Sequence, residues 1–179
     1  MQGELGSSHA YAMGGDFRKS PRYLIGFLGA DVMWDENSSA WRVTHVVRGD
    51  SWDSRNPPPL LRPGVNVGEG TVIVAVNNQP VTRDVSPSRL LVHQAGAEVV
   101  LTAADLPGGA TRDVVVKAAI DDTMIRYREW VERNREWVHE HSKGRCGYVH
   151  IPDMGPWGFA EFHRLFLVEL DRDGCPTHG

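Results

Sequence analysis

Hydrophobic residues between positions 20 and 120 occur in short runs separated by turn-forming Gly, Pro and Asn. Apolar and β-branched runs of this length predict strands rather than long helices, and they lie at 41–47, 71–76, 98–103 and 111–116. Asn77-Asn78 predicts a tight hairpin turn, because Asn tolerates positive φ. A short helix is expected over 86–94, with Ser86 as its cap and Pro87 in its first turn. Together these elements predict a small β-rich α+β domain.

The period of the hydrophobic pattern becomes helical after Asp121. An amphipathic helix is expected over 121–143, followed by a strand at 147–152 and a second amphipathic helix over 158–170. Trp130 and Trp137 lie seven residues apart on one face of the first helix, which indicates docking against a neighbouring domain. A membrane-surface helix is disfavoured, because its polar face is mixed in charge. The apolar faces across 121–170 predict self-association or disorder when this part lacks partners.

The composition narrows the function further. A net charge of −4, with no block of Lys and Arg, disfavours nucleic-acid binding. The sequence has no apolar run that could span a membrane and no secretory pattern, so a soluble, cytoplasmic protein is expected. Cys146 and Cys175 are far apart and form no CxxC pair, and no HExxH motif occurs, so no disulfide framework, metal site or cofactor is expected.

Two segments are candidates for chemistry. Ser8 and His9 are adjacent, but on spacing alone a loop serine and a loop histidine are favoured, and no GxSxG motif occurs. The glycine-containing turn at 26–30 lacks the features of a phosphate-binding loop. Its backbone N–H groups could instead cradle the carboxylate of a peptide that adds to a strand edge opposite the short helix. On these residues alone, a buried bend remains an equally good interpretation.

Longer motifs in the chain resemble a known family. The segment from Gly64 to Val81, GVNVGEGTVIVAVNNQPV, is similar to the later part of the PDZ domains in tricorn proteases. The segments 26–31 (GFLGAD) and 47–52 (VRGDSW) resemble the opening and the middle of the same domain. The flanks GELGSSHAYAMGGDFR and GYVHIPDMGPWGFAEFHRLF resemble the adjoining edges of the catalytic core, so the similarity covers about residues 2 to 174.

This resemblance implies a fold and a division of the chain. The fold class is α+β, a small PDZ-like, partly open β-barrel or sandwich with short helices, followed by an amphipathic helix and an incomplete strand–helix piece of the protease core. The expected parts are the end of a first catalytic-core segment (1–19), the PDZ-like domain (20–120), a linking helix (121–143), the start of a second core segment (144–174) and a tail (175–179). The tail, CPTHG, departs from the buried strand that the family would have, and is interpreted as an altered or added end.

The resemblance also implies a function. Tricorn proteases are large cytosolic serine peptidases, and Ser8 and His9 match the serine–histidine pair that precedes their PDZ domain. The family's nucleophilic serine and glutamate have no match here, so this chain alone is expected to be inactive. Peptide binding is expected at Phe27, Leu28, Gly29, Ala30, Leu90, Leu91 and Gln94.

The expected partners are peptides or unfolded segments, the remaining half of the protease core and, in the parent protein, identical subunits. An alternative is a scaffold domain that packs core halves or subunits together and binds no free peptide. A weaker alternative is a fragment that donates His9 to another chain.

Overall fold

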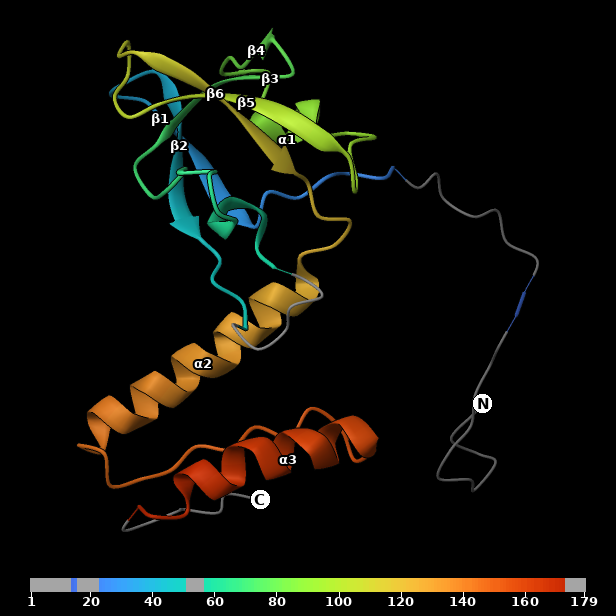
Figure 1. Cartoon of the computed structure of the whole chain (residues 1–179), viewed down its shortest axis with the longest axis vertical. Coiled ribbons are helices and arrows are strands. Elements are labelled where there is room, and N and C mark those ends of the chain that lie inside the picture. The colour runs from blue at the N-terminus through green and yellow to red at the C-terminus, as the bar shows by residue number, and fades with distance from the viewer. Residues whose placement is uncertain (1–13, 16–22, 51–56, 173–179) are drawn as a thin grey trace.

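The computed structural model describes residues 14–15, 23–50 and 57–172. Its strands gather into one sheet, and two long helices lie below that sheet in successive layers (Figure 1). The elements in chain order are β1 (Ala30–Asp35), β2 (Ala40–Val46), a 3-10 helix (Pro59–Leu61), β3 (Val72–Val76), β4 (Gln79–Pro80), α1 (Pro87–Leu90), β5 (Glu98–Ala104), β6 (Thr111–Lys117), α2 (Thr123–His141) and α3 (Pro156–Glu169).

The sheet is antiparallel throughout, with strand order β1-β2-β3-β5-β6 and β4 paired to β3. The turn between β3 and β4 consists of Asn77 and Asn78, which have φ values of 49° and 63°. Two consecutive residues with positive φ form the type I′ turn that matches strand twist, which confirms the hairpin predicted at these asparagines. β1 and β6 are the ends of the strand order, so one long edge of β1 carries no partner strand.

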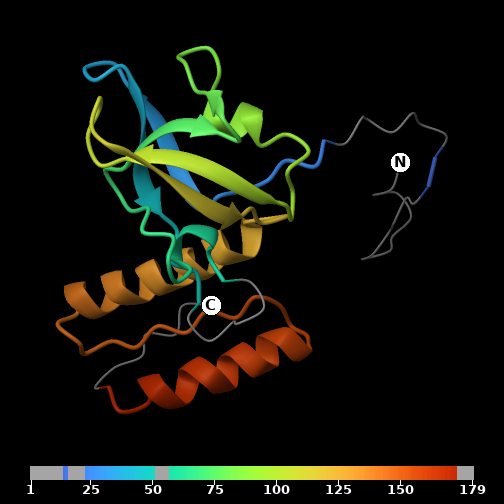
Figure 2. The same cartoon turned by 45° about the horizontal axis from the view of Figure 1, so that its top comes forward.

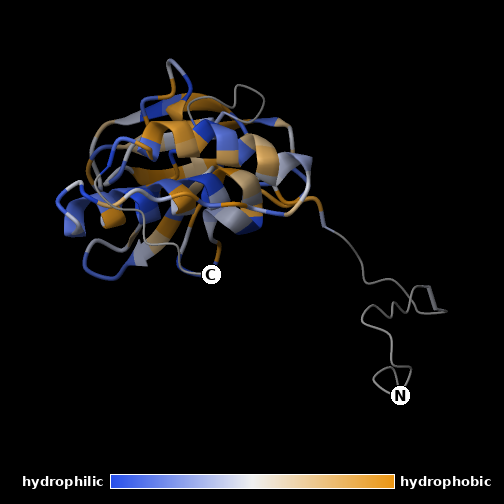
Figure 3. Cartoon of the chain, turned by 90° about the horizontal axis from the view of Figure 1, so that it is seen from below, coloured by the Kyte–Doolittle hydropathy of each residue, from blue (hydrophilic) through white to orange (hydrophobic). Residues whose placement is uncertain are grey.

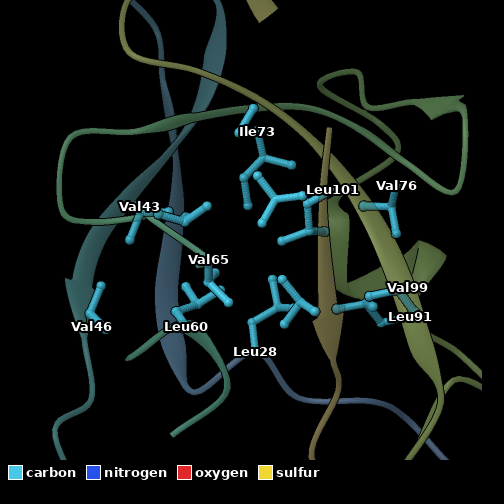
Figure 4. Close-up of a cluster of buried hydrophobic side chains, with 14 residues drawn as sticks. Leu28, Val43, Val46, Leu60, Val65, Ile73, Val76, Leu91, Val99 and Leu101 are labelled. Carbon is cyan, nitrogen blue, oxygen red and sulfur yellow. The ribbon is translucent and has the colours of Figure 1, made fainter. Parts of the chain in front are cut away.

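A single apolar cluster fills the space between the strands, the 3-10 helix and α1 (Figure 4). Inward-facing positions alternate along the strands, as the period of two requires. On β6, for example, Val114 and Val116 are buried whereas Val115 is exposed. The cluster consists of Leu28, Val43, Val46, Leu60, Val65, Val67, Ile73, Val76, Leu91, Val99, Leu101, Ala103, Val114 and Val116.

Helix α1 begins as the sequence predicts but ends early. The Ser86 side chain accepts a hydrogen bond from the Arg89 N–H, and Pro87 occupies the first turn. The expected extent to residue 94 is wrong: the helix stops at Leu90, and His93 has a φ of 62°, which no right-handed helix accommodates. Helix α1 is therefore only one turn long.

The second half of the chain forms the two-helix layer. Both predicted helices are present as α2 and α3, and Thr123 at the start of α2 donates its N–H to Asp121 Oδ1 at 2.9 Å. The strand expected over 147–152 is wrong. This segment runs between α2 and α3 (Figure 2), where no strand among the described residues can supply a ladder, and side chains hold it instead. His150 Nε2, for instance, lies 2.7 Å from the Tyr127 hydroxyl.

The α+β fold class expected from the sequence is confirmed. Seen from below, the molecule presents hydrophobic and hydrophilic segments side by side (Figure 3). No helix within the described ranges is both long and apolar enough to cross a membrane.

Candidate peptide-binding groove

The unpartnered edge of β1 faces a groove of about 680 Å³ whose opposite wall is α1. Ser88 and Leu91 contribute from the α1 side, and Met33 from β1. Most of the lining is apolar, as in grooves that accept the side chains of an added strand. The full lining consists of Ile25, Gly26, Phe27, Leu28, Ala30, Asp31, Val32, Met33, Thr44, Pro87, Ser88, Leu91, Asp122 and Arg126.

In the glycine-containing turn at 26–30, which leads into β1, some backbone N–H groups donate hydrogen bonds within the described structure and others do not. The Gly26 N–H donates to Leu91 O at 2.8 Å, and the Phe27 N–H donates to Ala119 O at 2.9 Å. Within the described part of the chain, the N–H groups of Leu28 and Gly29 have no hydrogen-bond acceptor. Of these two residues, Leu28 lines the groove, so its N–H is the donor that the turn can offer to a ligand there.

Ala30 supplies a further donor and acceptor at the edge of the sheet. The Val47 N–H donates to Gly29 O at 2.9 Å, and Ala30 lies opposite Val46. This arrangement is that of a non-hydrogen-bonded antiparallel pair, in which the N–H and C=O of the paired residue point away from the neighbouring strand. The backbone of Ala30 therefore faces the open side of β1, where an added strand would lie.

The structure brings four of the seven predicted peptide-binding residues into the groove wall: Phe27, Leu28, Ala30 and Leu91. Leu90 packs instead against the apolar core. The carbonyl of Gln94 lies against Gly26, behind the turn, where a Cβ on the glycine would approach it to 2.9 Å. Gly29 has a φ of 67° and is buried beneath Pro59 and Ile125, so a side chain at this position would be strained and would collide with Pro59.

Helix α2 adds a charged side chain to the groove, and this residue was not among the peptide-binding positions expected from the sequence. Arg126 lies among Asp31, Asp122 and the carbonyl of Ala30, near the head of β1. Its Nε is 2.6 Å from Asp122 Oδ2, and its Nη1 is 2.8 Å from Asp31 Oδ1. Burial alone would lower the pKa of Arg126, but the hydrogen bonds that it donates to both carboxylates raise it. The i, i+4 spacing of Asp122 and Arg126 was visible in the sequence, but the contact of Arg126 with Ala30, 96 positions upstream, was not.

A histidine on β2 connects the sheet to the same helix. His45 Nε2 is 2.9 Å from Glu129 Oε2, and its Nδ1 is 3.1 Å from Glu69 Oε1. The hydrogen bond with Glu129 raises the pKa of His45 above its ordinary value, and Glu69 adds to this effect. Glu129 also accepts the Arg48 N–H at 2.9 Å. Helix α2 is thus fixed against β2 and the loop that follows it.

The predicted catalytic pair, Ser8 and His9, lies outside the described residues, so its role stays a prediction. Across the described ranges, no group of three or more His, Cys, Asp or Glu side chains is arranged to hold a metal ion.

Comparison with known proteins identifies the family of this region. The model of the tricorn protease PDZ domain matches residues 26–122, which contain the sheet, α1 and the turn. A tricorn protease homolog 1 from Streptomyces coelicolor is 42% identical over 175 residues, and a tricorn protease homolog from Saccharolobus solfataricus is 38% identical over 174 residues; each match covers 97% of this chain and 16% of the relative.

A crystal structure of the tricorn protease superposes with a TM-score of 0.82 at 35% identity, covering 97% of this chain and 17% of that one. The chain thus spans about a sixth of the length of the relatives that it matches. On the family match over residues 26–122, the chain belongs to the tricorn protease PDZ domain family.

Proposed function

We propose that this chain is the peptide-recognition region of a tricorn-like serine peptidase and binds or guides substrates by their C-termini. The observation that carries the proposal is the open edge of β1, which faces an apolar groove walled by α1. An extended peptide placed there would extend the antiparallel sheet, and its backbone would pair with the N–H and C=O of Ala30 that point away from β2.

The turn at 26–30 supports recognition of a chain end in particular. The donors of Leu28 and Gly29 have no partner in the described part of the chain, and Leu28 lines the groove at the head of β1, where an added strand would terminate. Several N–H groups converging on one point form an anion-binding concavity. A terminal carboxylate would satisfy them, whereas an internal peptide segment would not.

The catalytic step belongs, in this proposal, to the longer parent protein. Ser8 and His9 would contribute to its active site, and the nucleophile would come from a segment that this sequence does not contain. The chain alone would therefore bind peptides without hydrolysing them. The parent would work in the cytoplasm as a homo-oligomer, without a metal or another cofactor.

Titration of the folded chain with short peptides, followed by NMR shifts of residues 26–33 and 87–91, tests the proposal. Peptides ending in apolar or basic residues are compared with C-terminally amidated copies. We expect binding that is lost on amidation and on Ser88→Tyr, which fills the exposed wall of the groove. Val115→Tyr adds the same ring to the exposed face of β6 and is expected to leave binding unchanged.

A scaffold function is the second candidate, and specific contacts support it. Asp50, in the loop after β2, accepts a hydrogen bond from Arg164 of α3 at 2.6 Å, and His45 contacts Glu129 of α2. Ile125 of α2 packs against Gly29. A domain fixed this firmly to its helices could serve to hold parts of a larger protein together. Absence of binding with both peptide sets, on a folded sample, would favour this function over peptide recognition.

A further inference from the structure

The residue most suited to select for a peptide's C-terminus lies outside the PDZ-like domain, on helix α2. Arg126 lines the groove beside Leu28 and Ala30, and its Nη2 lies 3.4 Å from the Ala30 carbonyl on the open side of β1. No other basic side chain lines the groove among the residues that the structure describes. A peptide whose last residue reached the turn would place its carboxylate near this guanidinium.

The guanidinium has donors to spare. Arginine carries five N–H groups in a planar fork. One is used by Asp122 at Nε and one by Asp31 at Nη1, while the contact from Nη2 to Ala30 O is longer than an ordinary hydrogen bond. Each terminal nitrogen therefore keeps an N–H without a short partner, and release of Asp31 would leave Nη1 and Nη2 free to hold the two oxygens of a carboxylate.

The two aspartates differ in how firmly they hold the arginine. The Asp122 side chain is 11% exposed and precedes α2, four residues from Arg126, so it fixes the orientation of the guanidinium. The Asp31 side chain is 49% exposed and can turn into solvent at small cost, since exposed ion pairs are weak. Asp31 is thus positioned to be exchanged for another carboxylate.

We propose that Arg126 is the specificity-determining residue for the C-terminal carboxylate, and that Asp31 occupies its place in the free chain. The proposal rests on the proposed peptide-recognition function. Binding would exchange the Asp31 ion pair for one with the peptide, while Asp122 keeps the guanidinium in place. Helix α2 would then be a part of the peptide site, in addition to connecting the domain to α3.

Three variants compared by calorimetry or NMR titration test this assignment. With a carboxylate-ended peptide, Arg126→Gln is expected to weaken binding roughly tenfold or more, as expected when a charge-assisted pair is lost. Asp31→Asn removes the competitor and is expected to strengthen binding roughly threefold, the scale of an exposed pair. Arg133→Gln, at an exposed position on the same helix, removes an equal charge away from the groove and is expected to change nothing.

The amidated peptide is the control for recognition of the terminal carboxylate. The native chain and all three variants are expected to leave the amidated peptide unbound, and the amide exchange of β1 and α2 shows whether each variant keeps its fold. If the native chain binds the carboxylate-ended peptide but Arg126→Gln binds it equally or better, the assignment is overturned and the peptide-recognition function stands. If the native chain binds neither peptide, the function itself fails, and this assignment fails with it.

Discussion

The sheet domain and the two-helix layer below it are held together by different forces. Fourteen buried apolar residues fill the interior of the sheet domain. Helices α2 and α3 bury only three large apolar side chains, Ile125, Val131 and Leu165, and two carboxylates, Glu161 and Glu169. Ion pairs therefore contribute more to the packing of the helical layer, whereas burial of apolar side chains stabilises the sheet domain.

The ion pairs of the layer are short and share partners. Arg128 donates two hydrogen bonds to Glu161, at 2.6 and 2.7 Å, and Arg164 approaches the same carboxylate at 2.9 Å. Arg164 also contacts Asp50 of the sheet domain at 2.6 Å. Glu169 lies within 2.8 Å of His139 on α2. Charged contacts thus connect α2, α3 and the loop after β2, in addition to the aromatic contact of Tyr127 with Trp157.

The two regions should respond differently when a single contact is lost. Apolar contacts are many and individually weak, so losing one leaves the rest in place. A buried ion pair gives little net stability when complete, but removal of one partner leaves an uncompensated charge. The outer face of α3 also exposes large apolar side chains, with Phe159 at 68%. The stability of the helical layer should therefore depend more strongly on pH than that of the sheet domain.

The largest expected effect comes from truncation inside the sheet domain. Leu101 on β5 is fully buried at the centre of the apolar cluster. Leu101→Ala removes apolar contacts and leaves a cavity, so the free energy of unfolding should fall by about 3 kcal/mol. Urea denaturation followed by circular dichroism measures it. Leu106→Ala, at a side chain that is 69% exposed, is the matched control and should change stability by less than about 0.5 kcal/mol. Equal effects would contradict the core assignment.

A smaller but more local effect is expected from Glu161→Ala in the helical layer. The variant leaves the Arg128 guanidinium, whose side chain is largely buried, without its bidentate partner. We expect the protection of α3 amides to fall by about 2 kcal/mol, less than for a fully buried pair, because Arg164 is partly exposed. Hydrogen exchange measures this helix by helix. Glu136→Ala, at an exposed position of α2, serves as the control. Equal loss of protection in β5 would show that the two regions do not unfold separately.

Local patterns in the sequence predicted the sheet domain well. The Asn77-Asn78 turn and the Ser86 cap depend on a few neighbouring residues, and both are formed as expected. Four of the seven peptide-binding residues that the family resemblance implied line the groove, and their binding role stays a prediction. The family resemblance rather than the hydrophobic pattern identified the domain type, because many small sheets share the same alternation.

Features that depend on distant contacts could not be predicted in this way. Arg126 was assigned only to a linking helix, since its contact with Ala30 requires α2 to return beneath the sheet. The strand expected at 147–152 had a suitable apolar pattern but finds no neighbouring strand in the described structure. Glu161 and Glu169 fell within an apolar helix pattern, where carboxylates are ordinarily assigned to the solvent face, and both are buried.

Acidification should weaken the helical layer before the sheet domain. Hydrogen bonds from Arg128 hold the pKa of Glu161 below its ordinary value. Burial would raise the pKa of Glu169, but the hydrogen bond with His139 and the charge of Arg172 outweigh this and lower it. Groups with lowered pKa values stabilise the fold above their unfolded pKa, and that stability is lost as pH falls through the folded pKa.

The protection factors of the α3 amides, taken relative to the intrinsic exchange rate at each pH, should therefore fall from about pH 4.5 downward, the ordinary range of a glutamate pKa, whereas those of β5 should change less. Glu161→Gln should reduce this pH dependence. A larger loss of protection in β5 than in α3 on acidification would reverse the assignment of ionic and apolar regions.

The smallest expected effect concerns the histidine that joins the two regions. The pKa of His45 is raised, chiefly by its hydrogen bond with Glu129, so the stabilisation is fully present below the ordinary histidine pKa and is lost as pH rises through the raised one. Its side chain is 40% exposed, which keeps the contribution below about 1 kcal/mol. Between pH 6 and 8 the first turns of α2 should therefore lose amide protection, opposite in sign to the acid response of α3. His45→Gln should abolish this loss while α3 keeps its acid response. A native chain whose α2 protection is constant over this range would show that Ile125 and Arg126, rather than the charged histidine, hold α2 to the sheet.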